Sequence, residues 1–280
     1  MADDLSPRVT ELSLRFEGRP VRLIASGPER GPAVLFLHPY PLSADCWLGL
    51  LAACARAGMR AAALDLPGFG GSPARGVPLL MDDAARLAAL ALDALEAAGA
   101  ALVGCSMGGY ASIAFARLYP ERLRALCLMN TKASPDTPEG KAGREAGAKA
   151  ALAGSALATT GPLLPKLVAP GLAERQPALW QQIQRLAAGA SAQGVADALR
   201  GMAERPDAAP WLRLCQAPAL VVAGESDQLI PRAELEALSR ALPRGRLEVV
   251  AGAGHYAFLE RPAEVEALLL GFLNDAECGG

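Results

Sequence analysis

Short apolar runs recur along this chain and are separated by polar or glycine-rich segments. Several of the runs are apolar throughout, which is typical of strands covered on both faces of a mainly parallel sheet. They predict eight strands, at residues 11–16, 21–25, 33–37, 60–64, 100–103, 123–129, 219–223 and 247–250. The first two runs are joined by Gly18, Arg19 and Pro20, and we expect them to form an antiparallel hairpin at one edge of the sheet.

Segments with the apolar spacing of helices lie between most of these runs. They predict helices near residues 44–57, 82–98, 108–118, 232–241 and 262–274. Because strand and helix alternate, the sequence predicts an α/β fold with a doubly wound, mostly parallel, eight-stranded sheet.

The alternation stops between Thr131 and Pro210, where only helical patterns occur. They cover residues 139–153, 156–168, 178–188 and 193–204, with Pro and Gly between them. We expect residues 131–210 to form a helical lid inserted into a core made of residues 1–130 and 211–280. A lid at the carboxyl edge of the sheet would shape the pocket, because ligands bind at that edge in open α/β sheets.

Residues 104–108 have the sequence G-C-S-M-G and stand between an apolar run and a helical pattern. A G-x-S-x-G motif in that setting is typical of a nucleophile elbow, a sharp turn that lifts the serine clear of its backbone. Ser106 is therefore the candidate nucleophile. A Cβ at Gly104 or Gly108 would collide with the neighbouring strand or helix.

A serine nucleophile needs a base to take its proton. The chain has two histidines. His255 follows the last predicted strand in a glycine-rich loop and comes after Ser106, which is the expected order. His38 precedes Ser106, and we interpret it as a structural residue that braces its own loop.

The base needs an acid that holds its tautomer and stabilises the imidazolium. Asp227 directly follows the run at 219–223 and lies between Ser106 and His255 in the chain. Glu225 and Asp207 are its rivals. Some enzymes of this kind place the acid one strand earlier, but Asn130 occupies that position and cannot carry a charge.

The tetrahedral intermediate of acyl transfer needs two N–H donors for its oxyanion. One should be the backbone N–H of Met107, just after the nucleophile. The other should come from the loop after the third strand, where His38 is followed by Pro39, Tyr40 and Pro41. Proline has no N–H, so the expected donor is the backbone N–H of Tyr40.

Composition narrows the classes of partner. The formal net charge is −2 and no long basic run occurs, which argues against nucleic acid and anionic membrane surfaces as partners. Residues 1–4, M-A-D-D, are unlike a secretory signal, and no apolar stretch is suited to span a membrane. We therefore expect a cytoplasmic protein of 280 residues whose partner is a small-molecule substrate. The oligomeric state stays open.

Metal and cofactor chemistry is not expected. The six cysteines include no C-x-x-C pair, and with two histidines the chain has no cluster of zinc ligands. The serine chemistry described above is complete without a metal or an organic cofactor.

Together, these motifs resemble the α/β-hydrolase superfamily over essentially the whole chain. The resemblance includes D-x-x-G-x-G-x-S at residues 65–72, which in that family is a structural turn near the site. Pro39 departs from the family's usual H-G-x-P loop and constrains the backbone there. The elbow helix and the N-T-K-A sequence at residues 130–133 are similar to small bacterial carboxylesterases with a helical cap.

The resemblance implies a cofactor-free serine hydrolase that cleaves carboxylic esters through an acyl-enzyme on Ser106. Epoxide hydrolases and haloalkane dehalogenases of this fold use an Asp nucleophile, so Ser106 argues against both. A lactonase or a C–C bond hydrolase would use the same triad. Acyl transfer to an acceptor other than water is a further alternative, and so is a ligand-binding protein without turnover on this fold.

The predicted lid indicates which lengths of acyl chain the pocket would accept. It has no long apolar face that would open onto a lipid interface, so we expect a preference for short acyl esters. Candidate pocket walls are Trp180, Leu163, Leu164 and Leu167, although packing within the lid would explain these residues equally well.

Overall fold

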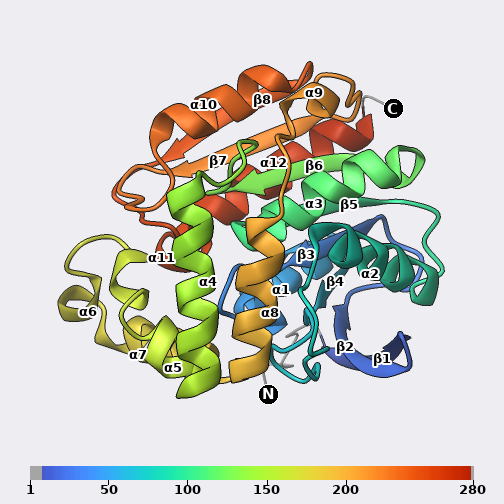
Figure 1. Ribbon diagram of the computed structural model, residues 1–280. Helices are drawn as coiled ribbons and strands as arrows, with labels where there is room; N and C mark the ends of the chain where they lie inside the picture. Colours follow the sequence, from blue (N-terminus) through green and yellow to red (C-terminus); the bar gives the residue numbers. More distant parts are fainter. Residues whose placement is uncertain (1–7, 279–280) are drawn as a thin grey trace, which may run out of the picture.

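The computed structural model describes residues 8–278 of the chain, so the N-terminal residues 1–4 discussed above lie outside the described part. Eight strands form one sheet in the order β1-β2-β4-β3-β5-β6-β7-β8 (Figure 1). They are β1 (Thr10–Phe16), β2 (Arg19–Ser26), β3 (Ala33–Leu37), β4 (Arg60–Leu64), β5 (Ala100–Cys105), β6 (Leu123–Met129), β7 (Ala219–Gly224) and β8 (Gly245–Val250).

Only the edge of the sheet formed by β1 and β2 is antiparallel. β1 pairs with β2, and β2 with β4, in antiparallel register, whereas β4, β3, β5, β6, β7 and β8 are paired in parallel. The predicted hairpin and the doubly wound, mostly parallel sheet are confirmed. The carboxyl ends of β3, β5, β7 and β8 consequently lie at one edge of the sheet.

Helices cover both faces of the sheet. On one face, α2 (Met81–Ala94), α3 (Met107–Leu118) and α10 (Arg232–Ala241) share an apolar cluster with Leu35 and Leu37 of β3. On the other face, α1 (Leu48–Arg56) and α12 (Pro262–Cys278) share a second cluster with Val34 and Phe36. The alternation within β3 is the two-residue period of a strand buried on both sides. Three short helical turns lie between these elements: η1 (Ala44–Trp47), η2 (Pro120–Arg122) and α11 (Ala257–Glu260).

All the elements between β6 and β7 are helical. They are α4 (Pro138–Ala153), α5 (Ala156–Thr160), η3 (Leu164–Lys166), α6 (Leu172–Arg175), α7 (Pro177–Ala188), α8 (Ala192–Ala203) and α9 (Ala209–Leu212). The expected single helix at 156–168 is wrong, because α5 ends at Thr160 and the chain turns at Gly161 and Pro162. Proline cannot donate the backbone hydrogen bond that would continue a helix. The short helices α6 and α9 were not predicted.

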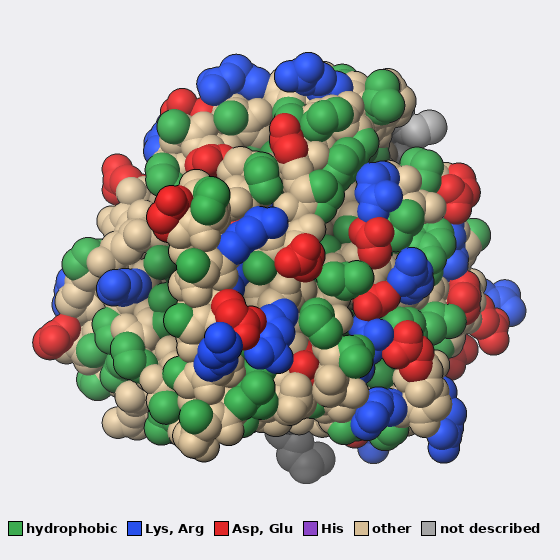
Figure 2. All heavy atoms as spheres, in the orientation of Figure 1, with side chains coloured by type: hydrophobic (Ala, Val, Ile, Leu, Met, Phe, Trp, Pro, Cys, Tyr) green, Lys and Arg blue, Asp and Glu red, His purple; other side chains and the backbone are tan. Residues whose placement is uncertain are grey.

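Helix α8 is attached to the core through the loop after β4. The N–H of Leu79 donates to the Asp197 carbonyl at 2.9 Å, and the N–H of Gly76 donates to the Asp197 carboxylate at 2.9 Å. α8 also packs beside α4 (Figure 1). On the face drawn in Figure 2, acidic and basic side chains are interspersed over these helices.

A charged cluster lies where the helical segment meets α3. Asp136, which precedes α4, binds the guanidinium groups of Arg144 and Arg205, with 2.7 Å between Asp136 Oδ1 and Arg205 Nη2. The side chains of Asp136 and Arg205 are 7% and 5% exposed. The Arg205 guanidinium also lies 3.5 Å from the centre of the Tyr110 ring in α3. Burial would raise the pKa of Asp136, but its bonds to Arg144 and the charge of Arg205 outweigh burial and hold that pKa below its ordinary value.

We expect Asp136→Asn to lower the free energy of unfolding at neutral pH by about 3–5 kcal/mol, because it leaves a buried guanidinium without its counter-charge. The native pKa of Asp136 lies below an unfolded value of about 3.9, so this contribution is complete above about pH 4 and is lost as the pH falls further. Urea unfolding at pH 7 and pH 3 measures both effects.

The matched control is Asp275→Asn, which removes an exposed carboxylate 3.5 Å from Arg246. Exposed pairs contribute about 0–1 kcal/mol, so this variant should unfold almost as the wild type does. Equal losses in the two variants would contradict a structural role for the buried cluster.

Candidate active site

Ser106 stands at the turn from β5 to α3 in a strained backbone conformation, with φ of 51° and ψ of −114°. Three hydrogen bonds hold this turn. The N–H of Ser106 donates to the Met129 carbonyl at 3.0 Å, and its own carbonyl accepts from Thr131 Oγ1 at 2.9 Å and from the N–H of Tyr110 at 3.0 Å. A positive φ is costly for a side chain that bears a Cβ, so these contacts maintain the strain.

The glycines on either side of Ser106 allow the strand and helix to pack closely. A Cβ on Gly108 would overlap the backbone carbonyl of Leu37 at the end of β3, and a Cβ on Gly104 would overlap the carbonyl of Gly108. The collisions expected from the sequence are therefore present. The start of α3 lies directly against the end of β3. The loop that follows β3 carries Tyr40, the candidate oxyanion donor.

His255 and Asp227 are in direct contact. His255 Nδ1 lies 2.8 Å from Asp227 Oδ2, and both side chains are 1% exposed. Asp227 follows β7, and His255 follows β8, so adjacent parallel strands deliver the two residues to the same edge of the sheet. Of the rivals, Glu225 accepts from the N–H of Gly252 at 2.8 Å, and Asp207 accepts from the N–H of Ala209 at 3.0 Å.

The surroundings of Asp227 favour its ionised form. Oδ1 accepts from the N–H groups of Leu229 and Ile230 at 2.8 and 3.2 Å, while Oδ2 accepts from Asn130 Nδ2 at 2.8 Å as well as from His255. Burial would raise the pKa of Asp227, but the hydrogen bond and charge of His255, with those other donors, lower it below its ordinary value. Asn130, considered above as the alternative acid position, thus donates to the acid.

An ionised Asp227 can only accept, so Nδ1 of His255 carries a proton. The neutral form of the ring then presents a lone pair on Nε2. Nε2 is buried and has no hydrogen-bond partner among the described residues. In the described part of the chain, Nε2 therefore forms no hydrogen bond with the Ser106 hydroxyl. The neighbour of Ser106, Cys105, does reach the histidine loop, with its Sγ 3.7 Å from the His255 carbonyl. Hydrogen bonds between a base and its nucleophile are often long in unliganded enzymes and tighten with substrate.

The two candidate oxyanion donors lie on the loop after β3 and at the first residue of α3. The backbone N–H groups of Tyr40 and Met107 have no hydrogen-bond acceptor among residues 8–278. The Tyr40 carbonyl, in contrast, accepts from the Tyr256 hydroxyl at 2.9 Å. Because Tyr256 follows His255, this bond joins the Tyr40 loop to the histidine loop.

His38 is fully buried in the loop that it was expected to brace. Its Nε2 accepts from the N–H of Leu66 at 3.0 Å, so Nδ1 carries the proton and donates to the Pro39 carbonyl at 3.1 Å. Burial lowers the pKa of His38, which favours the neutral ring that these two bonds require. His38 thus links the Tyr40 loop to the segment after β4.

The helical segment between β6 and β7 is bonded to both loops that carry the acid and the base. Gln228, next to Asp227, donates through Nε2 to the Val168 carbonyl at 3.0 Å. On the other loop, the buried Glu260 accepts from the N–H of Ala169 at 2.9 Å and from the N–H of Gly254 at 3.1 Å. Sequence reasoning did not identify Glu260. The available signal was a carboxylate that closes the apolar stretch 256–259, five positions after His255.

The candidate pocket walls pack at this same junction. Leu164 and Leu167 are buried in a cluster that includes Tyr256 and Phe258, and Leu163 and Trp180 pack against it partly buried. Leu164 and Trp180 also line an open cavity of about 520 Å³ on the helical segment. Their contact with substrate stays a prediction.

Two further properties of the described part of the chain bear on function. None of the helices within residues 8–278 combines the length and apolar character that crossing a bilayer demands. Among the same residues, no group of three or more His, Cys, Asp or Glu side chains is placed to hold a metal ion.

The comparisons with known proteins identify the family. Residues 32–262 match the family model described as alpha/beta hydrolase fold. The chain belongs to the α/β-hydrolase family. Among solved structures, a thermophilic esterase from Thermogutta terrifontis with malate bound superposes on this hydrolase with a TM-score of 0.88. That match has 30% identity and covers 96% of this chain and 99% of the esterase.

Two curated relatives of this hydrolase have different activities. A dihydrolipoyllysine-residue acetyltransferase component of an acetoin cleaving system from Pseudomonas putida is 31% identical over 266 residues, which are 92% of this chain and 67% of that protein. A pimeloyl-[acyl-carrier protein] methyl ester esterase from Aeromonas hydrophila is 28% identical over 257 residues, which are 88% of this chain and 96% of that protein.

We expect Glu260→Gln to lower the free energy of unfolding by about 1–3 kcal/mol, because the new amide turns an N–H toward one of two buried N–H groups that the carboxylate accepts. Thermal unfolding followed by circular dichroism measures the loss. Glu264→Gln, on an exposed residue of α12, is the control and should unfold within about 0.5 kcal/mol of the wild type. A Glu260→Gln variant as stable as that control would show that these two bonds do not hold the junction.

Proposed function

We propose that this hydrolase cleaves carboxylic esters through an acyl-enzyme on Ser106. One observation carries the proposal: the buried His255–Asp227 pair leaves His255 Nε2 without a partner among the described residues, at the sheet edge where the strained Ser106 turn stands. A neutral imidazole oriented by a carboxylate is the base that a serine nucleophile requires.

In the proposed reaction, Ser106 Oγ attacks the ester carbonyl while His255 Nε2 takes the hydroxyl proton. Asp227 holds the Nδ1–H tautomer and stabilises the imidazolium. The backbone N–H groups of Tyr40 and Met107 bind the oxyanion. The alcohol leaves with the proton from His255, and water then attacks the acyl-enzyme with His255 again as base, which releases the carboxylic acid.

Ester cleavage is favoured over the other reactions of this triad by the relatives. The Thermogutta esterase and the Aeromonas methyl ester esterase both carry that activity in their names, and each match covers at least 88% of this chain. Lactone and C–C bond hydrolysis would use the same residues. We therefore propose a small-molecule ester as the substrate and Ser106, Asp227 and His255 as the catalytic residues.

We further propose that residues 131–210 act as a cap over this site. The bonds from Gln228 and Glu260 to residues 168–169 support the proposal, because they attach the helical segment to the chain segments that follow Asp227 and His255. A cap attached at two points limits the length of the acyl chain that the pocket accepts.

We expect Ser106→Ala to lower the turnover of p-nitrophenyl butyrate by about 10⁶-fold, because loss of a triad nucleophile leaves only the contributions of the oxyanion donors and of binding. Release of p-nitrophenol under steady-state conditions measures the effect. Circular dichroism checks that the variant is folded. Retention of a tenth of wild-type activity would exclude Ser106 as the nucleophile.

The role of Asp227 as the acid is tested by Asp227→Asn. Glu225→Gln, an isosteric change at a neighbouring carboxylate, is the matched control. Asp227→Asn should reduce turnover by about 10⁴-fold, because the amide favours the wrong histidine tautomer. Glu225→Gln changes a carboxylate that bonds only to the N–H of Gly252 among the described residues, so its effect should be much smaller. The reverse order would assign the acid to Glu225.

For substrate length, we expect kcat/KM to rise and then fall along p-nitrophenyl acetate, butyrate, octanoate and palmitate, with its maximum at two to about six acyl carbons. Each buried methylene contributes about 0.8 kcal/mol until the chain meets a wall of the pocket. A maximum at palmitate, or activation at an oil–water interface, would instead indicate an open, lipase-like site.

A further inference from the structure

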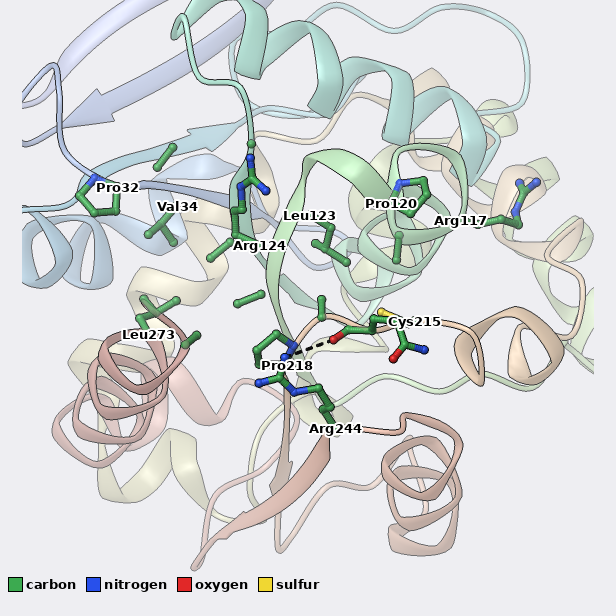
Figure 3. A pocket seen from close by; sticks show the side chains of 18 of the residues that line it. Pro32, Val34, Arg117, Pro120, Leu123, Arg124, Cys215, Pro218, Arg244 and Leu273 are labelled. Atoms are coloured by element: carbon green, nitrogen blue, oxygen red, sulfur yellow. Dashed lines mark hydrogen bonds between the residues drawn. The ribbon is translucent and has the colours of Figure 1, made fainter. Parts of the chain in front are cut away.

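A second cavity lies at the amino-terminal ends of the parallel strands, opposite the carboxyl-terminal ends that Ser106 and His255 follow. It has a volume of about 1090 Å³ and is lined where β3, β5, β6 and β7 begin, by residues that include Ala33, Ala101, Leu123 and Pro218 (Figure 3). In parallel strands the beginnings and ends lie at opposite edges. The cavity is therefore separate from the candidate active site, and its size is sufficient for a small-molecule ligand.

The floor of this cavity is apolar. Val34 and Ala125 come from the sheet, and Leu273 comes from the last turns of α12 (Figure 3). Leu214, which is 75% exposed, and the half-buried Trp211 add apolar surface that a ligand can contact. Such a floor suits a hydrocarbon chain.

The charged side chains of the lining are all cationic. They are those of Arg117, Arg124 and Arg244, and the described residues of the lining include no Asp or Glu. Arg117 is bound to Asp82 at 2.5 Å, but neither Arg124 nor Arg244 forms an ion pair within residues 8–278. Arg244 donates only to the Gln216 carbonyl, at 3.4 Å (Figure 3).

Guanidinium groups without a counter-charge favour a ligand that supplies negatively charged oxygens, and a guanidinium matches the two oxygens of a carboxylate.

We propose that this cavity binds a fatty-acid carboxylate, with the chain on the apolar floor and the head group at Arg124 and Arg244. An amphipathic anion satisfies both halves of the lining. A neutral amphiphile would leave the guanidinium groups unmatched, and a cationic one would be repelled. This site does not depend on the proposed reaction at Ser106.

Isothermal titration with sodium decanoate, kept below its micelle concentration, tests the proposal on the full chain. We expect the double variant Arg124→Gln/Arg244→Gln to weaken binding at least about tenfold, and binding to the wild type to weaken as salt rises. The matched control is Arg30→Gln/Arg240→Gln, which removes two exposed arginines outside the cavity and should leave the affinity unchanged.

Further titrations distinguish binding in this cavity from binding at Ser106 and from nonspecific hydrophobic adsorption. The Arg124→Gln/Arg244→Gln protein should keep wild-type ester turnover while it loses decanoate binding, which a ligand bound beside Ser106 would not explain, and Ser106→Ala should still bind decanoate. Octanoate should bind about fifteenfold more weakly than decanoate, at about fourfold per methylene. Absence of decanoate binding, equal binding by decyltrimethylammonium, or loss of binding in Ser106→Ala would overturn the proposal.

A measurement on the wild type covers the case in which the arginine variant does not fold. Trp211 lines the cavity, Trp47 is buried in the core, and Trp180 lies on the helical segment. A brominated decanoate should therefore quench tryptophan fluorescence, and Trp211→Phe should remove most of that quenching. Quenching that persists in Trp211→Phe would place the ligand elsewhere and contradict the proposal.

Discussion

The close packing of the α3 N-terminus on the end of β3 is the constraint on which the rest of the site depends. Gly108 lies against the Leu37 carbonyl, so no side chain separates the helix from the strand. That contact, with the bonds from Ser106 to Met129, Thr131 and Tyr110, maintains the positive φ of Ser106. The strain is confined to this turn, and the packing of the surrounding sheet and helix offsets its free-energy cost.

The parallel sheet brings distant residues together. Tyr40, Ser106, Asp227 and His255 follow four different strands, and the parallel pairing of those strands sets them at a common edge. Each loop is then braced by another. His38 bonds the Tyr40 loop to Leu66, and Tyr256 bonds it to the histidine loop. Such cross-bracing gives the preorganised polar groups that the proposed acyl transfer requires.

The buried carboxyl groups of this fold have two different kinds of surroundings. Asp227 and Asp136 both have neighbours that lower their pKa values, through His255 and through two arginines respectively. Glu260 has backbone donors instead of a strong counter-charge, and burial raises its pKa. These carboxylates join separate parts of the chain. Glu260 attaches the helical segment to the core, Asp136 joins the two ends of that segment, and Asp227 orients the candidate base.

The sheet, the elbow and the order of the chemical groups can be predicted from the sequence, because they depend on local patterns. Apolar runs mark strands buried on both faces, and G-x-S-x-G between strand and helix marks a turn whose glycines have no alternative. The pairing of Asp227 rather than Glu225 with His255 was also accessible, since Asp227 follows its strand directly. The bonds between the helical segment and the two loops were not accessible. They join positions such as Ala169 and Glu260, which are 91 residues apart. The contact of Asn130 with the acid and the cavity at the far edge likewise arise from packing between distant segments. The break in the helix expected at 156–168, in contrast, follows from the local signal of Gly161 and Pro162. Contacts between distant segments could not be predicted in this way, because no periodic pattern along the chain encodes which surfaces meet.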